Sequence, residues 1–329
     1  AQNAGKKSVT LNLKSGEGRA LFHKLAVTAD AVVESFRPGV MARLGCDAAR
    51  LRALNPRLVY CAISGFGQTG PMSGRPAYDQ IIQGLSGIMS VTGDEETAPL
   101  RAGFPVSDAI AGLNGAMAIC AALTGAARTG KGATLDVSML DSSIATAAWV
   151  VSNFLITGQI PVPMGNENRT ASPSGTFRTA DGLLNISANK QQHWEIVADT
   201  LGLSHLRDDP RFRQRDTRKG NRHLLNPLLE DVLLTKGAAE WERILNNRGV
   251  PAGRVLSVPD VVQLDQLHHR DFFRTFASVP GIDRTITVAN GGFVFENEGR
   301  GDIAPPARLG QHNAEILGSI GVGTGAMDQ

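Results

Sequence analysis

The chain has 329 residues and a formal net charge of +2, and 42% of its residues are hydrophobic. This composition is that of a well-packed globular protein and excludes a disordered or fibrous chain. The length exceeds one ordinary core, which indicates a large domain accompanied by a smaller one. The charge is near neutral and no block of Lys and Arg is interleaved with aromatic residues, so we expect no nucleic-acid partner.

The sequence carries no pattern of a metal site, a disulfide or a membrane anchor. Its three cysteines, Cys46, Cys61 and Cys120, lack C-x-x-C spacing and stand among apolar neighbours, so we expect reduced core thiols in a cytoplasmic protein. No H-E-x-x-H or similar histidine spacing suggests zinc. We find no leader and no uncharged stretch of about 18 apolar residues, and therefore expect no membrane span.

The first half of the chain alternates helical and strand-like stretches, which is typical of an α/β layer with mostly parallel strands. Apolar residues at helical spacing predict helices at 15–28, 47–54, 78–90, 107–128 and 140–157. Short apolar runs predict strands at 31–34, 58–64 and 133–138. We therefore expect residues 1–158 to form a large domain with a Rossmann-like parallel sheet.

The character of the sequence changes after residue 158. Residues 159–175 contain three prolines and little periodicity, which is typical of a linker or a functional loop. Residues 176–278 hold a strand pair around Asp181-Gly182 and amphipathic helices, including one at 221–235 with a proline interruption, so we expect a small α+β domain. Residues 279–329 are expected to return to the large domain and to include a short helix near 313–320.

An arginine-rich run extends from Arg207 to Arg222 and also contains three aspartates. Mixed charges of this kind are typical of a solvated connection between helices, which is the interpretation we favour. The alternative is that one of these arginines contacts a phosphate group.

A glycine-rich segment at 65–70 (GFGQTG) follows a predicted strand and matches the dinucleotide fingerprint G-x-G-x-x-G. That fingerprint needs a helix directly after the loop. Pro71, Gly74 and Pro76 prevent such a helix, so the match gives little support to a nicotinamide or flavin site.

A second segment, at 125–131, resembles a phosphate-binding loop. However, Gly132 stands where a Ser or Thr would hold magnesium, and the segment ends a predicted helix although the motif should leave a strand. We therefore expect a glycine-rich helix C-cap that leads into the next strand.

Seven short segments, none of them specific alone, form a specific set by their order and spacing. They are GKKSVTLNLK at 5–14, ESFRPG at 34–39, NPRLVY at 55–60, SGFGQTGP at 64–71, AYD at 77–79, TGKG at 129–132 and LGQH at 309–312. The set resembles the CaiB/BaiF family, the class III CoA-transferases, over nearly the whole chain. The resemblance implies an interlocked homodimer and acyl-CoA and carboxylic acid substrates. It also implies that coenzyme A is a substrate and that no cofactor is permanently bound.

The resemblance identifies Asp108 as the nucleophile. In this family the nucleophile is an aspartate downstream of the A-Y-D-like motif, at the start of a small-residue helix, and Asp108 occupies that place. From local sequence alone, Asp108 is instead the N-cap of a helix at 109–128. The two interpretations are compatible, because a helix N-terminus stabilises negative charge and would keep the carboxylate ionised for attack.

Four further positions follow from the resemblance. Tyr78 and Asp79 match residues beside the nucleophile, where Tyr78 would position the CoA thiol or the acyl group; the alternative for Tyr78 is a core aromatic at a helix start. Gly165 and Asn166 lie in the linker that corresponds to the substrate lid of formyl-CoA transferases. The glycine run of that lid is missing, so formate or oxalate specificity is not implied.

A third group of residues is expected to bind CoA. Ser35, Phe36 and Arg43 align with family positions that line the CoA nucleotide, and the loop with Gly67 is expected to shape the cleft. Arg43 would pair with a phosphate oxygen, or else it is a charge on a helix surface. Family members usually begin with a further segment that carries the first strand and helix and touches CoA. We expect this sequence to start after that segment, so its activity without the segment stays open.

The chemistry explains why a carboxylate is required as the nucleophile. Attack on an acyl-CoA yields a mixed anhydride, which keeps the acyl group activated toward an incoming carboxylate. A Ser or Cys nucleophile would give an ester or thioester too unreactive for that step. Water must be excluded to protect the anhydride.

The sequence therefore predicts a CoA-transferase that moves CoA from an acyl-CoA, such as succinyl-CoA, to a carboxylic acid through an aspartyl anhydride and thioester. Two alternatives stay open. The 2-methylacyl-CoA racemases of the same family use a histidine and an aspartate as acid and base, but Tyr78 occupies the histidine position, and tyrosine, with an ordinary pKa of about 10, is a poor proton acceptor. The other alternative is a non-catalytic CoA-binding or scaffolding chain.

Overall fold

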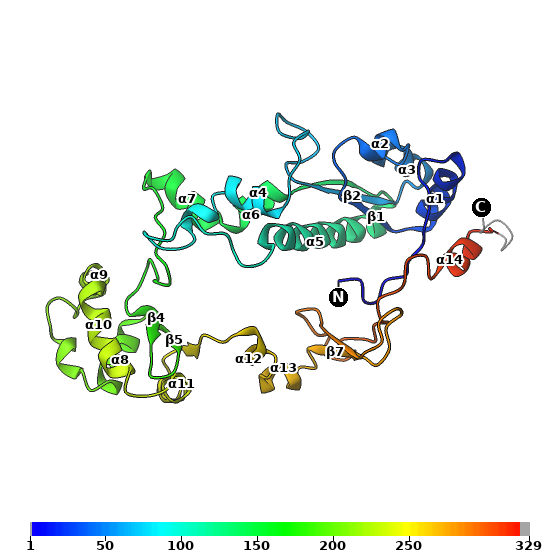
Figure 1. The fold of residues 1–329 in the computed structure, drawn as a ribbon. Coiled ribbons are helices and arrows are strands. Elements are labelled where there is room, and N and C mark those ends of the chain that lie inside the picture. The colour runs from blue at the N-terminus through cyan, green and yellow to red at the C-terminus, as the bar shows by residue number, and fades with distance from the viewer. Residues whose placement is uncertain (1, 323–329) are drawn as a thin grey trace. The chain divides into compact units, whose positions relative to one another are not determined.

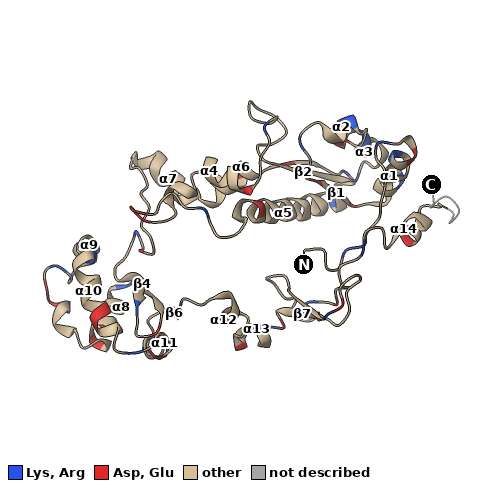
Figure 2. Ribbon diagram, viewed as in Figure 1, with Lys and Arg blue, Asp and Glu red and all other residues tan. Residues whose placement is uncertain are grey.

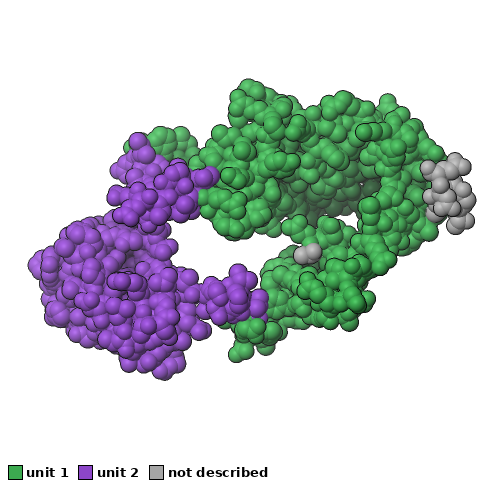
Figure 3. Space-filling view, viewed as in Figure 1, with its two compact units in different colours: residues 1–88, 101–158, 263–329 green, residues 89–100, 159–262 purple. Residues whose placement is uncertain are grey.

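A computed structural model describes residues 2–322 and divides the chain into two compact units (Figure 3). Unit 1 contains the residues up to 88, residues 101–158 and the residues from 263 onward, and unit 2 contains residues 89–100 and 159–262. These units differ from the predicted domains at two places. Residues 89–100 belong to unit 2, and unit 2 ends at residue 262, whereas the sequence places the end of the small domain at 278.

A three-stranded parallel sheet lies at the centre of unit 1, which confirms the predicted α/β class. The strands β1 (Ala31–Glu34), β2 (Val59–Ser64) and β3 (Thr134–Ser138) follow in the order β1-β2-β3. All three strands were predicted within one residue of their bounds. Short apolar runs identify them because the central strand of a parallel sheet is buried on both faces.

The side chains of β2 alternate between two apolar layers. Tyr60 and Ala62 pack on one side with residues of α1 (Gly16–Thr28) and α3 (Ala48–Leu54). Cys61 packs on the other side with residues from α4 (Asp79–Leu85) and α5 (Val106–Thr129). Figure 1 shows α5 running along the sheet.

The remaining elements of unit 1 are α2 (Val40–Arg43), α6 (Met139–Thr146), α7 (Ala148–Thr157), α13 (Asp265–His269), the antiparallel pair β7 (Phe273–Phe276) and β8 (Ile286–Ala289), and α14 (Asn313–Ser319).

Small residues bring α5 close to the sheet. A Cβ added at Gly115 would lie only 3.1 Å from Cδ1 of Ile63 in β2. The helix ends at Gly130, a left-handed C-cap with φ 71°, which confirms the C-cap predicted for the segment that resembles a phosphate-binding loop.

The composition of α5 corrects two expectations. The helix has no charged residue between Asp108 and Arg128, and its middle is accordingly tan in Figure 2. By length and composition α5 could cross a membrane, contrary to our reading of the sequence, although the core helix of a soluble protein meets the same criterion. Cys120, on this helix, is exposed, whereas Cys46 and Cys61 are buried as expected.

Two predicted helices have other bounds in the structure. The predicted helix at 140–157 is broken at Ala147 into α6 and α7, which are bent by 73°; as a pair they also meet the membrane criterion. The run has no Pro or Gly breaker, so its local sequence does not explain the bend. The two helices differ in burial, because α6 has buried residues and α7 has none. The helix predicted at 78–90 ends at Leu85 and is followed by the 3-10 turn η1 (Met89–Val91).

Unit 2 packs helices on one face of a three-stranded antiparallel sheet. The sheet has the order β4 (Ser174–Arg178), β5 (Leu183–Ser187), β6 (Ala252–Arg254). Its core is centred on Trp194, Phe212, Leu229 and Trp241. The helical elements are α8 (Gln191–Thr200), η2 (Ser204–Arg207), α9 (Arg215–Gly220), α10 (Arg222–Leu233), α11 (Ala238–Asn247) and α12 (Val258–Val261).

The predicted interruption of α10 is absent. Pro227 lies inside this helix, which continues through it to Leu233. The face formed by Leu225, Leu229 and Leu233 is completely buried, and its burial offsets the hydrogen bond that proline cannot donate.

The arginine-rich run is not simply a solvated connection. Arg218 is 1% exposed and donates hydrogen bonds to the backbone oxygens of Ser172, at 2.6 Å, and Phe212, at 2.7 Å. Its guanidinium also lies over the ring of Trp194. Burial and the charge of Arg215 lower the pKa of Arg218 to about 10. The side chain thus ties the linker before β4 to the helices of unit 2.

We expect Arg218→Ala to lower the free energy of unfolding of unit 2 by about 2–4 kcal/mol, because two buried carbonyl oxygens lose their donor. Urea unfolding followed by the fluorescence of Trp194 and Trp241 measures this. Arg213→Ala, which removes an exposed side chain from the same run, should cost less than about 0.5 kcal/mol. Equal losses in the two variants would contradict the structural role of Arg218.

Candidate active site

A cavity of about 550 Å³ lies at the carboxyl ends of β1 and β2 in unit 1. This is the edge at which parallel sheets bind their ligands. The wall consists of Ser35, Phe36, Arg37, Pro38, Ile63, Ser64, Gly65, Ser73, Arg75, Pro76, Ala77, Tyr78, Asp108, Ala111, Gly112 and Met139. Asp108 is the single acidic residue of this described wall.

Asp108 is the third residue of α5 and not its N-cap, so the N-cap prediction was wrong. The N-cap is Pro105, which has no side chain to accept from the amides of the first turn. The pKa of Asp108 is raised, first by its burial and second by the negative charge of Asp79. Burial and this neighbouring charge therefore oppose the stabilisation of the carboxylate that the sequence predicts from the helix N-terminus.

Asp79 takes the capping role. It is 8% exposed, and its Oδ1 accepts from the backbone N–H of Ser107 at 2.9 Å and more weakly from that of Asp108 at 3.4 Å. Its Oδ2 accepts from Nε2 of Gln83 at 2.6 Å. Asp79 is not one of the residues that form the cavity wall, and it supports Asp108 through the backbone of the first turn of α5.

Two buried side chains complete this support, and sequence reasoning missed both. Gln83 is fully buried, and its Oε1 accepts from the backbone N–H of Ala102 at 2.9 Å, which fixes the segment before α5. Ser143 of α6 donates to the hydroxyl of Ser107 at 3.0 Å. The sequence did offer a signal for Gln83, because it follows Asp79 by one helical turn.

Tyr78 lines the cavity and is 81% exposed, which excludes the alternative of a core aromatic. Ser35 and Phe36 also line the cavity, and the Phe36 ring is half exposed. Three of the predicted residues therefore share one cavity with Asp108.

Arg43 and Gly67 lie outside the cavity wall. Arg43 ends the short helix α2. Gly67 has φ 87° and approaches the Asp136 side chain, which accepts from the N–H of Gln68 at 2.9 Å. The GxGxxG loop is thus anchored to β3, and no helix follows it, as the sequence predicts.

Arg37, Ser73 and Arg75 line the cavity but were not predicted. Arg37 belongs to the quoted ESFRPG segment and Arg75 lies three residues before Tyr78, so proximity to these motifs was a usable signal. Two guanidinium groups give this cavity the means to bind phosphate.

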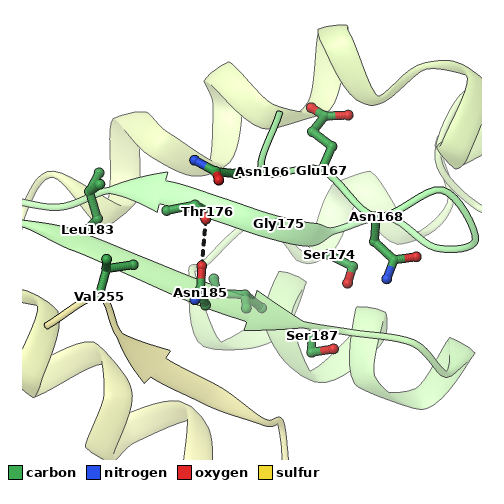
Figure 4. A pocket seen from close by; sticks show the side chains of 11 residues that line it. Asn166, Glu167, Asn168, Ser174, Gly175, Thr176, Leu183, Asn185, Ser187 and Val255 are labelled. Atoms are coloured by element: carbon green, nitrogen blue, oxygen red, sulfur yellow. Dashed lines mark hydrogen bonds between the residues drawn. The ribbon is translucent and has the colours of Figure 1, made fainter. Parts of the chain in front are cut away.

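Gly165 and Asn166 belong to unit 2. Gly165 has φ 57°, and its N–H donates to the backbone oxygen of Gly93 at 2.7 Å. Asn166 lines a second cavity, within unit 2 (Figure 4).

Comparison with known proteins agrees with this geometry. The family model described as CoA-transferase family III matches residues 1–313. The chain belongs to this family. Class III CoA-transferases act on CoA thioesters, and a cavity with one carboxylate and two arginines fits such a substrate.

Several relatives of this CoA-transferase are similar over most of their length. The succinate–glutarate CoA-transferase of Agrobacterium fabrum is 33% identical, over 97% of this chain and 80% of the relative. The acetyl-CoA:oxalate CoA-transferase of Acetobacter aceti is 38% identical, over 82% of this chain and 69% of the relative. The crystal structure of a CaiB/BaiF family protein from Brucella suis matches with a TM-score of 0.85 and 32% identity, and covers 97% of this chain and 83% of that protein.

We expect Asp79→Asn to shift the pH dependence of Asp108 reactivity. The negative charge of Asp79 raises the pKa of Asp108, so its removal lowers that pKa and keeps Asp108 ionised to lower pH. The acid limb of the rate of acyl-CoA consumption should then move to lower pH. Asp30→Asn, a matched change before β1, should leave the limb in place; an unmoved limb in Asp79→Asn would show that the coupling is absent.

Proposed function

We propose that this CoA-transferase works through a covalent intermediate on Asp108. The observation that carries the proposal is that Asp108 is the one acidic residue of the described cavity wall at the carboxyl edge of the parallel sheet. The same wall holds Tyr78, at the position that the family resemblance assigns beside the nucleophile. Asp79 cannot compete as the nucleophile, because its oxygens are engaged behind the wall.

In the first half-reaction, the Asp108 carboxylate attacks the thioester carbonyl. The C–S bond breaks, CoA leaves as a thiolate, and a mixed anhydride forms. The thiolate then attacks the Asp108 carbonyl, and the donor acid leaves with the bridging oxygen, which came from Asp108. The enzyme now carries an aspartyl-CoA thioester.

The second half-reaction reverses these steps with the acceptor. Its carboxylate attacks the aspartyl thioester and expels the thiolate, which then attacks the acceptor's acyl carbon. The new acyl-CoA leaves, and Asp108 keeps one oxygen of the acceptor. No step moves a proton, so a tyrosine at position 78 is sufficient where a racemase needs a histidine base.

Arg37 and Arg75 are proposed to hold the phosphates of CoA, with Ser35 and Phe36 beside the nucleotide. A guanidinium binds phosphate through paired charge-assisted hydrogen bonds, and an exposed aromatic ring offers apolar surface to a base. This assignment replaces Arg43, which lies outside the cavity wall.

We expect Arg75→Ala to raise the KM for acyl-CoA about tenfold, because one charge-assisted contact to phosphate is lost. Arg43→Ala should leave this KM unchanged. Steady-state kinetics at fixed acid concentration measures both. The opposite ranking would restore Arg43 as the phosphate ligand.

Succinyl-CoA is the proposed donor, and a short dicarboxylic acid is the proposed acceptor. The Agrobacterium fabrum relative is named for succinate and glutarate, which supports this choice.

A homodimer is also proposed. Its support is the exposed apolar surface of unit 1, where Leu113, Met117, Trp149 and Ile156 are each at least half exposed, and surfaces of this kind mark interfaces. Sedimentation velocity separates dimer from monomer.

We expect Asp108→Asn to lower the rate of CoA transfer from succinyl-CoA to glutarate at least about a thousandfold, because the amide cannot form the anhydride. The cavity should still bind CoA, as isothermal titration with free CoA would show. Retained transfer in this variant would exclude Asp108 as the nucleophile. The unmodified chain could instead bind CoA and transfer none. Exchange of the α-proton of an acyl-CoA with solvent would then indicate a racemase, and no exchange would indicate a binding protein.

A further inference from the structure

Four residues of the unit 1 cavity wall come from one segment, 35–38, which directly follows β1. Within the described residues 2–322, the backbone of this segment forms two hydrogen bonds. The N–H of Val40 donates to the backbone oxygen of Arg37 at 3.1 Å, and the N–H of Phe36 donates to the side chain of Glu34 at 2.7 Å. The first half of the segment is therefore held by a single side chain.

Side-chain packing does not hold this segment. The Phe36 ring is half exposed and joins no buried hydrophobic cluster of the described chain. The guanidinium of Arg37 is exposed and has no hydrogen-bond or ion-pair partner among residues 2–322. The place of both side chains in the cavity wall therefore depends on the backbone of the segment.

Glu34 connects the segment to the buried sheet. It is the last residue of β1, is 9% exposed and is not one of the residues that form the cavity wall. Its Cα pairs in register with that of Ala62 in β2, and Tyr60, two residues earlier, points to the same side of the sheet. Oε2 of Glu34 accepts from the Phe36 amide, and Oε1 accepts a long hydrogen bond of 3.5 Å from the Tyr60 hydroxyl.

The carboxylate of Glu34 is buried without a cation. No Lys, Arg or His side chain in residues 2–322 forms a salt bridge with it. Burial raises the pKa of Glu34, and the hydrogen bonds from Phe36 and Tyr60 lower it. An apolar side chain at the end of β1 would avoid the cost of burying this charge. The carboxylate therefore indicates a role other than packing.

We infer that Glu34 is a positioning residue for CoA, which holds the segment 35–38 in the cavity wall before the substrate binds. The inference rests on the proposed function and adds to it a residue that does not touch the substrate. A segment that is already ordered loses less conformational entropy on binding, so a fixed Phe36 and Arg37 bind CoA more tightly. Asp108 is held separately, by Asp79, so Glu34 should affect the affinity for CoA and not the chemical step.

The test compares three variants of the full chain. Glu34→Ala removes the acceptor of the Phe36 amide, and Glu34→Gln keeps an acceptor oxygen at the same reach without the charge. Asp47→Ala is the control for stability. Asp47 caps α3 in the same unit by accepting from the N–H of Arg50 at 3.1 Å, and it does not line the cavity. The measurements are KM and kcat with succinyl-CoA and glutarate, the Kd for free CoA, hydrogen exchange and thermal unfolding.

We expect Glu34→Ala to raise the KM for succinyl-CoA and the Kd for CoA about tenfold, and Glu34→Gln to raise them about threefold, because a neutral amide is the weaker acceptor. The kcat and the KM for glutarate should change less than about twofold. Hydrogen exchange of the peptide that contains Phe36 should become faster in Glu34→Ala without ligand. Asp47→Ala should lower the melting temperature and leave the CoA constants and this exchange unchanged.

Unchanged CoA constants in both Glu34 variants would overturn the inference. An equal rise in Asp47→Ala would also overturn it, because the constants would then follow stability. A fall in kcat at constant KM would contradict it by placing Glu34 in the chemical step. If Glu34→Ala does not fold, the isosteric Glu34→Gln decides. Failure of the proposed function is a separate result, in which the unmodified chain binds no CoA or transfers none.

Discussion

The first turn of α5 depends on a carboxylate that comes from another helix. Pro105 cannot cap α5, so the amides of Ser107 and Asp108 are satisfied by Asp79, which is itself held by Gln83. This arrangement fixes the backbone of Asp108 and brings a second negative charge close to its carboxyl group. The contact between α4 and α5 therefore fixes the position of the proposed nucleophile, and after burial it is the second cause that raises the pKa of Asp108.

The cavity in unit 1 has one carboxylate and two arginines in its described wall. Guanidinium groups suit the phosphates of CoA, and class III CoA-transferases act on CoA thioesters. The proposed mechanism uses both kinds of group, because it requires the thioester to lie at Asp108 while the rest of CoA is held in the same cavity.

Local sequence was sufficient for β1, β2 and β3 and for α1, α3 and α5, because burial of β2 and the small residues of α5 leave direct patterns. It gave no bounds for β6, β7 and β8, which are short. It could not show the break at Ala147, which has no local breaker, or the burial of Arg218, which depends on the linker segment at Ser172. Family resemblance led to Asp108, Tyr78, Ser35 and Phe36, which share one cavity. It missed Arg75 and Gln83, because their roles arise where loops and helices distant in sequence meet.

Oxygen-18 transfer tests the central claim, that CoA moves through an anhydride on Asp108. One or a few turnovers with succinyl-CoA and glutarate labelled in its carboxylates are followed by mass spectrometry of the peptide that contains Asp108. The mechanism returns an acceptor oxygen to the aspartate, so the account predicts heavy oxygen in Asp108 and none in Asp79. Transfer of CoA with no label in Asp108 would contradict it.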